Sequence, residues 1–196
     1  ADTLSFELSL NKQRVLVNSG TSCYGLSNER LRQRGTSSHN TVTINGEDSS
    51  EVWSGFRVAR RAYPKNLQIK DSCLKNQIEV HCSQEGYYRL KGKPIHQRSW
   101  SMNESELLIK DKVLGSYETA VARFHFHPDV QVSITPNHKS GAIVLEGNKT
   151  LTWYIDDGLG KLEESSWHPK FGVCVPSICL EIKLINGVSI FRLRFH

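Results

Sequence analysis

Short segments of alternating apolar and polar residues recur along this chain, and they constrain its fold more than any other feature of the sequence. Successive side chains of a strand point to opposite faces, so this alternation is typical of strands with one buried face. TLSFELSL, at residues 3–10, is the first example. The same reasoning predicts further strands at residues 14–17, 41–44, 56–62, 78–82, 107–113, 119–126, 130–134, 181–185 and 188–195.

Two Asn-Gly pairs mark the sharpest turns between these segments. The first pair, Asn45-Gly46, directly follows the predicted strand 41–44, and the second pair is Asn186-Gly187. Asn-Gly favours the two-residue turn of a β-hairpin. Both segments beside the second pair alternate, so residues 181–195 are predicted to form a hairpin at the end of the chain.

Helical periodicity is nearly absent, and only SNERLRQ at residues 27–33 predicts a short helix. Residues 156–172 are rich in Gly and Ser and are predicted to form a long loop. Many short strands separated by turns indicate an all-β fold, an antiparallel β-sandwich, with a closed barrel as the alternative. The length, 196 residues, suits a single domain at residues 1–196.

Composition is that of a soluble globular protein, with 38% hydrophobic and 23% charged residues. The formal net charge of +5 favours an anionic partner, which leaves nucleic acid, an acidic glycan and a membrane surface open. No apolar run approaches the ~20 residues of a membrane span. The first alternating segment begins almost at Ala1, so we expect the chain to be a piece of a longer protein.

The five cysteines are odd in number and irregularly spaced, and no CxxC pair is present. This pattern does not indicate a disulfide framework or a zinc knuckle. We expect buried apolar side chains, with at most one disulfide bond.

Histidine and arginine clusters supply the candidate chemistry. His125 and His127 are two residues apart on a predicted strand and share a face, which suits a metal site, but two polar residues on a solvent face are the favoured interpretation. His96 and Arg98 repeat this spacing, and we interpret them as a satisfied polar face. No nucleophile elbow, phosphate-binding loop or dinucleotide fingerprint is present.

The stretch WSGFRVARR at residues 53–61 carries two arginines that would share a strand face, Arg57 and Arg61. Guanidinium groups bind carboxylate and sulfate through paired hydrogen bonds, and Trp53 suits stacking on a sugar ring. Nucleic-acid binding is an alternative for the same residues. A solvated strand face is as well supported as either function.

Several stretches together, ADTLSFELSL, RVLVNSGTSCYG, ERLRQRGTSSHNTVTINGEDSSEVWSGFRVARRA, EGYYRLKGKPIHQRSW, ELLIKDKVLGS and ARFHFHPDV, resemble the C-terminal region of the heparinase II/III-like polysaccharide lyases. The resemblance is strong over roughly the first two-thirds of the chain. It implies a β-sandwich that packs on an N-terminal α/α toroid, which this chain lacks. It also implies cleavage of an acidic, uronate-containing polysaccharide by β-elimination in the cleft between the two domains.

The resemblance implies a zinc site as well. A His-x-His pair would lie just upstream of Ala1, an aspartate would occupy the position of Asn18, and His39 of the His-Asn-Thr motif would be a ligand. An amide is a poorer zinc ligand than a carboxylate, so we interpret Asn18 and His39 as a remnant of this site. Zinc is therefore expected, if at all, in the full-length protein rather than in this chain.

Arg30, Arg34 and Asn40 are predicted to line the substrate cleft, because they lie close to His39 in the sequence. The isolated chain should be inactive, since half of the cleft is absent. Family resemblance further implies a periplasmic or secreted protein whose partners are an acidic polysaccharide and the toroid, not nucleic acid. Two other interpretations stay open, a glycan-binding sandwich without catalysis and a domain that only supports the toroid.

Overall fold

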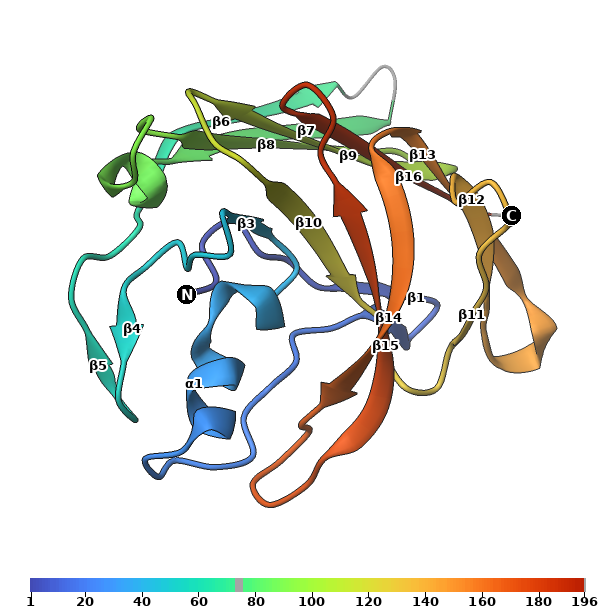
Figure 1. Ribbon diagram of the computed structural model, residues 1–196. Helices are drawn as coiled ribbons and strands as arrows, with labels where there is room; N and C mark the ends of the chain where they lie inside the picture. Colours follow the sequence, from blue (N-terminus) through green and yellow to red (C-terminus); the bar gives the residue numbers. More distant parts are fainter. Residues whose placement is uncertain (73–75, 196) are drawn as a thin grey trace.

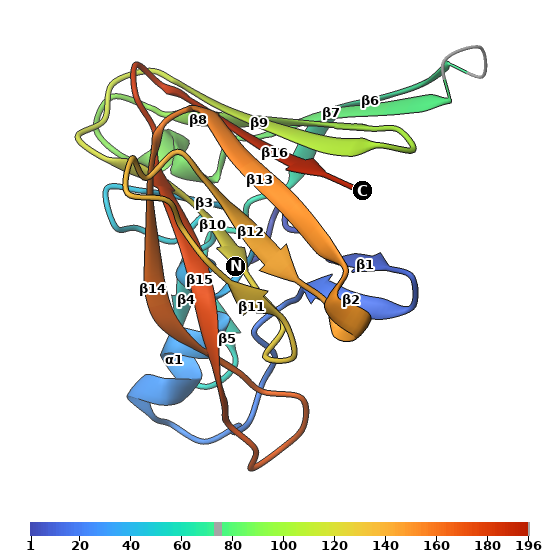
Figure 2. The same cartoon turned by 90° about the vertical axis from the view of Figure 1, so that its right-hand side faces the viewer.

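Two antiparallel β-sheets lie face to face in the computed structural model, which describes residues 1–72 and 76–195 (Figures 1 and 2). The smaller sheet has the strand order β14-β15-β10-β3, and these strands span Leu159–Trp167, Val175–Lys183, Ala120–His125 and Val42–Ile44. The larger sheet has the order β11-β12-β13-β16-β9-β8-β7-β6. Its strands span Gln131–Val132, Ser140–Val144, Thr150–Asp157, Val188–Arg194, Glu106–Leu114, Ile95–Met102, Gln77–Gln84 and Pro64–Ser72.

Two small hairpins and a few short helices complete the structure. The hairpins pair β1 with β2 and β4 with β5, and their strands span Leu8–Leu10, Gln13–Leu16, Val52–Trp53 and Arg57–Val58. The α-helix α1 spans Asn28–Arg34, and the 3-10 helices η1, η3 and η4 span Thr36–Ser38, Gly86–Arg89 and Glu146–Asn148. In Figure 1, α1 and the hairpin β4–β5 lie on the side of the molecule away from the larger sheet.

The apolar faces of the two sheets form the core. In β9, Ile109 and Val113 are buried while Lys110 and Lys112 are exposed, as period-two alternation requires. Phe124 of the smaller sheet stacks on Phe191 of the larger sheet, with ring centroids 4.3 Å apart. Burying each of these aromatic rings stabilises the folded state by roughly 2–3 kcal/mol relative to leaving it exposed. The predicted antiparallel β-sandwich is therefore confirmed.

Most of the predicted strands are present, with shifted ends. The segments around residues 14–17, 41–44, 78–82, 107–113 and 119–126 correspond to β2, β3, β7, β9 and β10. Three predicted strands shrink: only Leu8–Leu10, Arg57–Val58 and Gln131–Val132 are strands. The chain before β1 leaves the extended region because Leu4 has a φ of 65°. The predicted helix is α1, where the Ser27 side chain accepts the Arg30 amide as an N-cap.

The predicted hairpin at residues 181–195 is wrong, because its two strands do not pair with each other. The turn itself forms, because Asn186 and Gly187 both have positive φ and Ile185 and Val188 exchange two backbone hydrogen bonds. Beyond the turn, however, β15 pairs in the smaller sheet and β16 pairs in the larger one. The Asn-Gly pair therefore connects the two layers of the sandwich.

The predicted loop at residues 156–172 is also wrong. The chain reverses at Gly158 (φ 109°) and forms the nine-residue edge strand β14, Leu159–Trp167. Lys161 and two glutamates make this strand hydrophilic. Charged side chains are common on edge strands because they oppose pairing with another chain, and here they conceal the strand in the sequence.

The expectation of buried cysteines is confirmed for two of the four cysteines that the structure describes and is wrong for Cys174. Cys82 and Cys179 are buried, Cys23 is half-buried, Cys174 is exposed, and these four form no disulfide bond with one another. Cys73 lies outside the described residues. Within residues 1–72 and 76–195, no helix has the length and hydrophobicity needed to cross a membrane.

Candidate functional site

A polar hollow of about 360 Å³ lies between α1, the first residues of the chain and the hairpin β4–β5. We call it the arginine hollow, because Arg30, Arg34 and Arg61 line it together with His39. Asp2 is its only described carboxylate lining residue, so guanidinium groups outnumber carboxylates there. The remaining lining residues are Ala1, Thr3, Thr21, Gln33, Ser50, Val52, Val58, Ala62 and Tyr63.

His39 ends η1 and is held by its backbone, because its N–H donates to the carbonyl of Thr36 at 3.1 Å. The side chain is nearly buried, and its Nδ1 atom has no hydrogen-bond partner among the described residues. Burial, reinforced by the positive N-terminus, lowers the pKa of His39 to about 4, against the opposing effect of Asp2. The ring is therefore neutral at pH 7, and its Nδ1 atom is buried without a hydrogen-bond partner.

Arg30 and Arg34 project from α1 and hold the hairpin β4–β5 beside it. Arg30 donates from Nε to the carbonyl of Gly55 at 3.1 Å, and Arg34 donates from Nη1 to the carbonyl of Ser54 at 2.7 Å. Carbonyl partners satisfy donors without neutralising charge. The positive charge of both groups therefore remains available to the hollow.

Arg61 differs from these two arginines. It is exposed and forms no hydrogen bond or ion pair with the described residues. Its neighbour Arg60, in contrast, forms an ion pair with Glu51 and does not line the hollow. The predicted strand face shared by Arg57 and Arg61 is absent, because residues 59–62 are not a strand. Arg61 lines the hollow instead.

Asn40 lies beside this site but does not line the hollow. Its side chain is completely buried: the amide donates to the carbonyls of Phe6 and Val17, and its oxygen accepts the N–H of His125. No polar atom of this side chain is left for a substrate. The structure therefore places Asn40 as a connection between three segments rather than as a cleft-lining residue.

Asn18 is likewise outside the hollow. Its side-chain oxygen accepts the backbone N–H of Gly20 at 3.0 Å, which closes a local turn. The free Nδ1 of His39 suits a metal, but zinc requires three or four protein ligands. The described residues contain no group of three His, Cys, Asp or Glu side chains that would hold a metal ion. Residues 1–72 and 76–195 therefore do not fit a complete zinc site.

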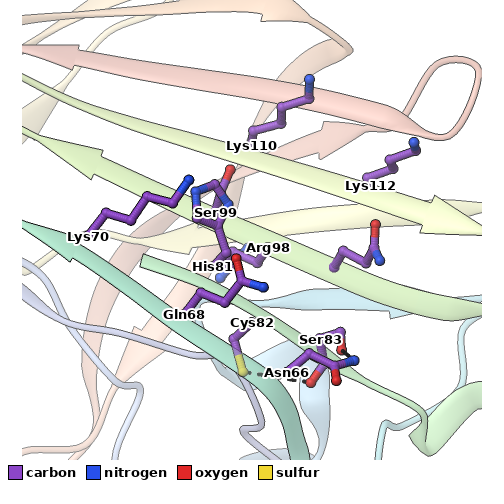
Figure 3. A pocket seen from close by; sticks show the side chains of 11 residues that line it. Asn66, Gln68, Lys70, His81, Cys82, Ser83, Arg98, Ser99, Lys110 and Lys112 are labelled. Atoms are coloured by element: carbon purple, nitrogen blue, oxygen red, sulfur yellow. Dashed lines mark hydrogen bonds between the residues drawn. The ribbon is translucent and has the colours of Figure 1, made fainter. Parts of the chain in front are cut away.

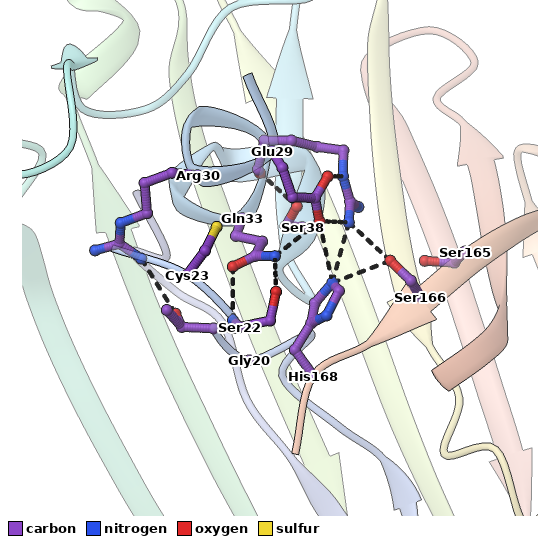
Figure 4. A network of polar contacts seen from close by, with 12 residues as sticks. Gly20, Ser22, Cys23, Glu29, Arg30, Gln33, Ser38, Ser165, Ser166 and His168 are labelled. Atoms are coloured by element: carbon purple, nitrogen blue, oxygen red, sulfur yellow. Dashed lines mark hydrogen bonds and ion pairs between the residues drawn. The ribbon is translucent and has the colours of Figure 1, made fainter. Parts of the chain in front are cut away.

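A second polar network lies on the other side of α1 (Figure 4). His168 Nε2 lies 3.1 Å from both Arg32 Nη2 and Ser166 Oγ, and its Nδ1 faces the carbonyl of Val173. Arginine only donates, so Nε2 accepts and Nδ1 carries the proton. Glu29 approaches the same nitrogen, Nε2, at 3.4 Å. The acid is thus on the serine side of the ring, which rules out a Ser-His-acid relay.

This network fixes the orientation of α1. Arg32 forms a bidentate ion pair with Glu29: its Nη2 and Nε atoms donate to the two carboxylate oxygens at 2.6 and 2.9 Å. This hydrogen bonding lowers the pKa of Glu29 to about 2. Gln33 donates to Ser22 and accepts from it, as Figure 4 shows. The helix is therefore anchored on one face while Arg30 and Arg34 point from the other.

The other histidine and arginine pairs that the sequence singled out make contacts within the fold. His125 is buried and contacts the Ser37 carbonyl at 3.0 Å, whereas His127 lies edge-on against Trp167. His96 and Arg98 both contact Asp111, so the predicted satisfied polar pair is found, although it is buried. Arg57 stacks over the ring of Trp53 at 5.0 Å.

Beside the arginine hollow, Tyr24 stacks on Phe56 and on Phe171, at centroid distances of 6.0 and 5.7 Å. We call these three residues the aromatic stack. Their exposed fractions are 54%, 68% and 67%, which is high for large apolar side chains. Arg30 lies over the Tyr24 ring at 5.2 Å and so joins the stack to the hollow.

Comparison with known proteins identifies a matching protein family and solved structures of similar fold. The family model described as "Heparinase II/III-like, C-terminal" matches residues 1–190. Solved structures of similar fold include a heparinase III, described as the BT4657 gene product, and the heparan sulfate lyase HepC from Pedobacter heparinus. The first matches with a TM-score of 0.75 and 16% sequence identity, and the second matches with a TM-score of 0.77 and 14% sequence identity. Each match covers 99% of this chain.

The chain spans only 30% of the length of these two solved proteins. No curated protein matches it significantly. At 14–16% identity the structural likeness shows the fold, while the family match over nearly all residues shows the relationship. This chain belongs to the heparinase II/III-like family, as a β-sandwich of its C-terminal type.

Proposed function

We propose that this chain is the sandwich half of a polysaccharide lyase that cleaves acidic, uronate-containing polysaccharide by β-elimination. The arginine hollow carries the proposal, because it gathers three guanidinium groups around a neutral histidine and only one carboxylate. In β-elimination a base removes the proton beside the uronate carboxylate, and the glycosidic oxygen then leaves. Negative charge grows toward the carboxylate during this step, so fixed cations nearby lower the barrier.

The residues of the hollow have separate roles in this proposal. Arg61, which has free donors, binds the carboxylate directly. Arg30 and Arg34 supply positive potential and keep the hairpin β4–β5 in place. His39 lines the hollow as a neutral ring whose buried Nδ1 has no hydrogen-bond partner among the described residues. Asn18 and Asn40 act only by holding the backbone around it.

The base and the acid belong to a part of the protein outside residues 1–196. We propose that this part is a toroid domain and that it covers the aromatic stack. Two observations support this partner: the matched proteins are more than three times as long as this chain, and the stack adjoins the hollow through Arg30. Replacing Phe56 and Phe171 by Ser should then loosen the domains and make their thermal unfolding separate.

If these replacements instead weaken glycan binding without changing domain cohesion, the stack contacts sugar and not the toroid.

The described residues do not fit a complete zinc site, so no step of this mechanism uses zinc. Any further ligands would come from outside residues 1–72 and 76–195. We also propose a periplasmic or extracellular location, where such polysaccharides are found.

Arg61 offers the sharpest test. Its removal breaks no hydrogen bond among the described residues, so Arg61→Gln should fold normally. In the intact protein we expect kcat/KM on an acidic polysaccharide to fall about tenfold, or roughly 1.4 kcal/mol. Arg60→Gln removes the same charge one residue away, outside the hollow, and is the matched control. Equal effects of both changes would contradict the proposed role of the hollow.

A further inference from the structure

A second hollow, of about 440 Å³, lies on the outer face of the larger sheet. Strands β6, β7, β8 and β9 form its floor (Figure 3). Lys110 and Lys112 of β9 point outward, because the residues on either side of them are buried in the core. We call this site the lysine hollow. This face is turned away from α1 and the N-terminus in Figure 1, so it is distinct from the arginine hollow.

Strand register places its polar side chains in two rows. One row runs Gln68, His81, Ser99, Lys110 across β6, β7, β8 and β9. The other runs Ser83, Gln97, Lys112 across the last three of these strands. Adjacent strands are about 4.8 Å apart, so the longer row extends over roughly 14 Å. The rows provide amide, hydroxyl and imidazole groups, which both donate and accept hydrogen bonds.

The charge of this hollow is unbalanced. Lys70, Lys110 and Lys112 line it, and no lining residue is a carboxylate. None of these lysines forms an ion pair among the residues that the structure describes. Elsewhere on the same sheet, basic residues are paired, as Arg192 is with Asp156 and Lys65 is with Glu85. Glu79 is the cross-strand neighbour of Lys70, so the uncompensated positive charge lies mainly at Lys110 and Lys112, where it would attract an anion.

An irregularity in β6 shapes the rim. The register shifts between Lys65 and Gln68, and Asn66 there has a φ of 55°. Its side-chain amide donates to Ser83 Oγ at 3.1 Å, across the strand boundary. Such bulges bend a strand and redirect side chains, and they are enriched beside binding sites. Asn66 lines the hollow, so the bulge lies at its rim.

We propose that the lysine hollow is a second binding site for an acidic polysaccharide. Lysine ammonium groups suit carboxylate or sulfate, and the two polar rows suit sugar hydroxyls. Nucleic acid is a poorer fit, because no aromatic side chain lines the hollow for base stacking. A long glycan that contacts both hollows gains affinity through its second attachment, while a short one does not. The inference takes its ligand class from the proposed function.

The test measures binding of long and short heparin fragments to the intact protein by titration calorimetry. Lys110→Gln/Lys112→Gln should weaken binding of the long fragment about tenfold, or about 1.4 kcal/mol, because two exposed charge pairs with the glycan are lost. Lys91→Gln/Lys170→Gln removes two exposed lysines outside both hollows and should change it less than twofold. Equal losses in both variants would overturn the proposal, as would no loss in either.

Two further readouts separate this proposal from the lyase assignment. Turnover of a fragment too short to reach the outer sheet should be the same in Lys110→Gln/Lys112→Gln and in the unaltered protein. An intact protein without lyase activity would refute the proposed function, yet the calorimetric difference would still support the lysine hollow. A variant that loses affinity for duplex DNA but keeps its affinity for heparin would overturn the glycan assignment.

Discussion

Arg98 and Asp111 face each other across β8 and β9 as a fully buried ion pair, joined by two hydrogen bonds of 2.7 and 2.9 Å. Arg98 also donates to the carbonyls of Leu4 and Asn40. Asn40 directly follows His39, so the pair fixes the backbone next to the arginine hollow. The larger sheet thereby positions a site that lies on the other side of the sandwich.

Breaking this pair should unfold the protein at much lower denaturant concentration. Arg98→Met removes both guanidinium hydrogen bonds from the buried Asp111 carboxylate and leaves it only the contact with His96, which costs about 3–5 kcal/mol. Urea unfolding followed by circular dichroism measures the loss. Arg123→Met breaks the half-exposed pair with Glu181 and should cost less than about 1.5 kcal/mol. Similar losses in the two variants would contradict a special role for the buried pair.

Acid should destabilise the fold in a defined pH range. Burial lowers the pKa of His39 and of His125 to about 4, whereas an unfolded histidine titrates near 6.5. As pH falls through this range the unfolded chain binds protons that the folded one does not. Stability is therefore complete above pH 6.5 and decreases toward pH 4, by up to about 1.4 kcal/mol per pH unit for each histidine.

The pH dependence of the unfolding free energy measures this effect. His39→Asn should make the slope between pH 6.5 and 4 shallower, and His138→Asn, at an exposed position, should leave it unchanged. A slope that His39→Asn does not alter would show that folding does not lower the pKa of His39.

The contact between Gly20 and His168 predicts a third outcome. Gly20 has a φ of 78°, and an added Cβ would overlap the His168 carbonyl. Gly20→Ala should therefore separate the loop from β14, with a loss of roughly 2–4 kcal/mol. Gly25→Ala meets no atom within 4 Å and should change stability by less than about 1 kcal/mol. Thermal melts of both variants compare them directly, and equal shifts would refute the strain at Gly20.

Zinc binding offers a fourth outcome. Asn18 replaces the carboxylate that the family resemblance implies, and its oxygen already accepts a backbone N–H. We expect elemental analysis of the isolated 196-residue chain to give well under one zinc per molecule after dialysis. Stoichiometric zinc that survives dialysis and disappears in His39→Asn would show that the missing ligands lie within this chain.

The sequence predicts the fold class well, because alternation reports which face of a strand is buried. It fails where a pairing depends on distant partners. Asn186-Gly187 predicts its turn correctly, but local sequence does not reveal that β15 and β16 enter different sheets. The strand β14 is missed because its charged edge residues obscure the alternation.

In the arginine hollow, too, sequence predicts some residues correctly and misses those that only the fold brings together. His39 is identified through the motif resemblance and lies in the arginine hollow. Asn40 is adjacent in sequence, yet its side chain points into the interior and bonds three separate segments. Arg61 lies 22 positions from His39 and reaches the hollow only through the fold. Proximity in sequence thus identifies Arg30 and Arg34 correctly, but it includes Asn40 wrongly and misses Arg61.

The most direct test of the central proposal is the ultraviolet absorbance of unsaturated uronate, the product of β-elimination. The intact protein and the isolated 196-residue chain are each incubated with a panel of acidic polysaccharides. We expect the intact protein to form this product from at least one polysaccharide and the isolated chain to form none. Turnover by the isolated chain, or no product from the intact protein on any acidic polysaccharide, would contradict the central proposal.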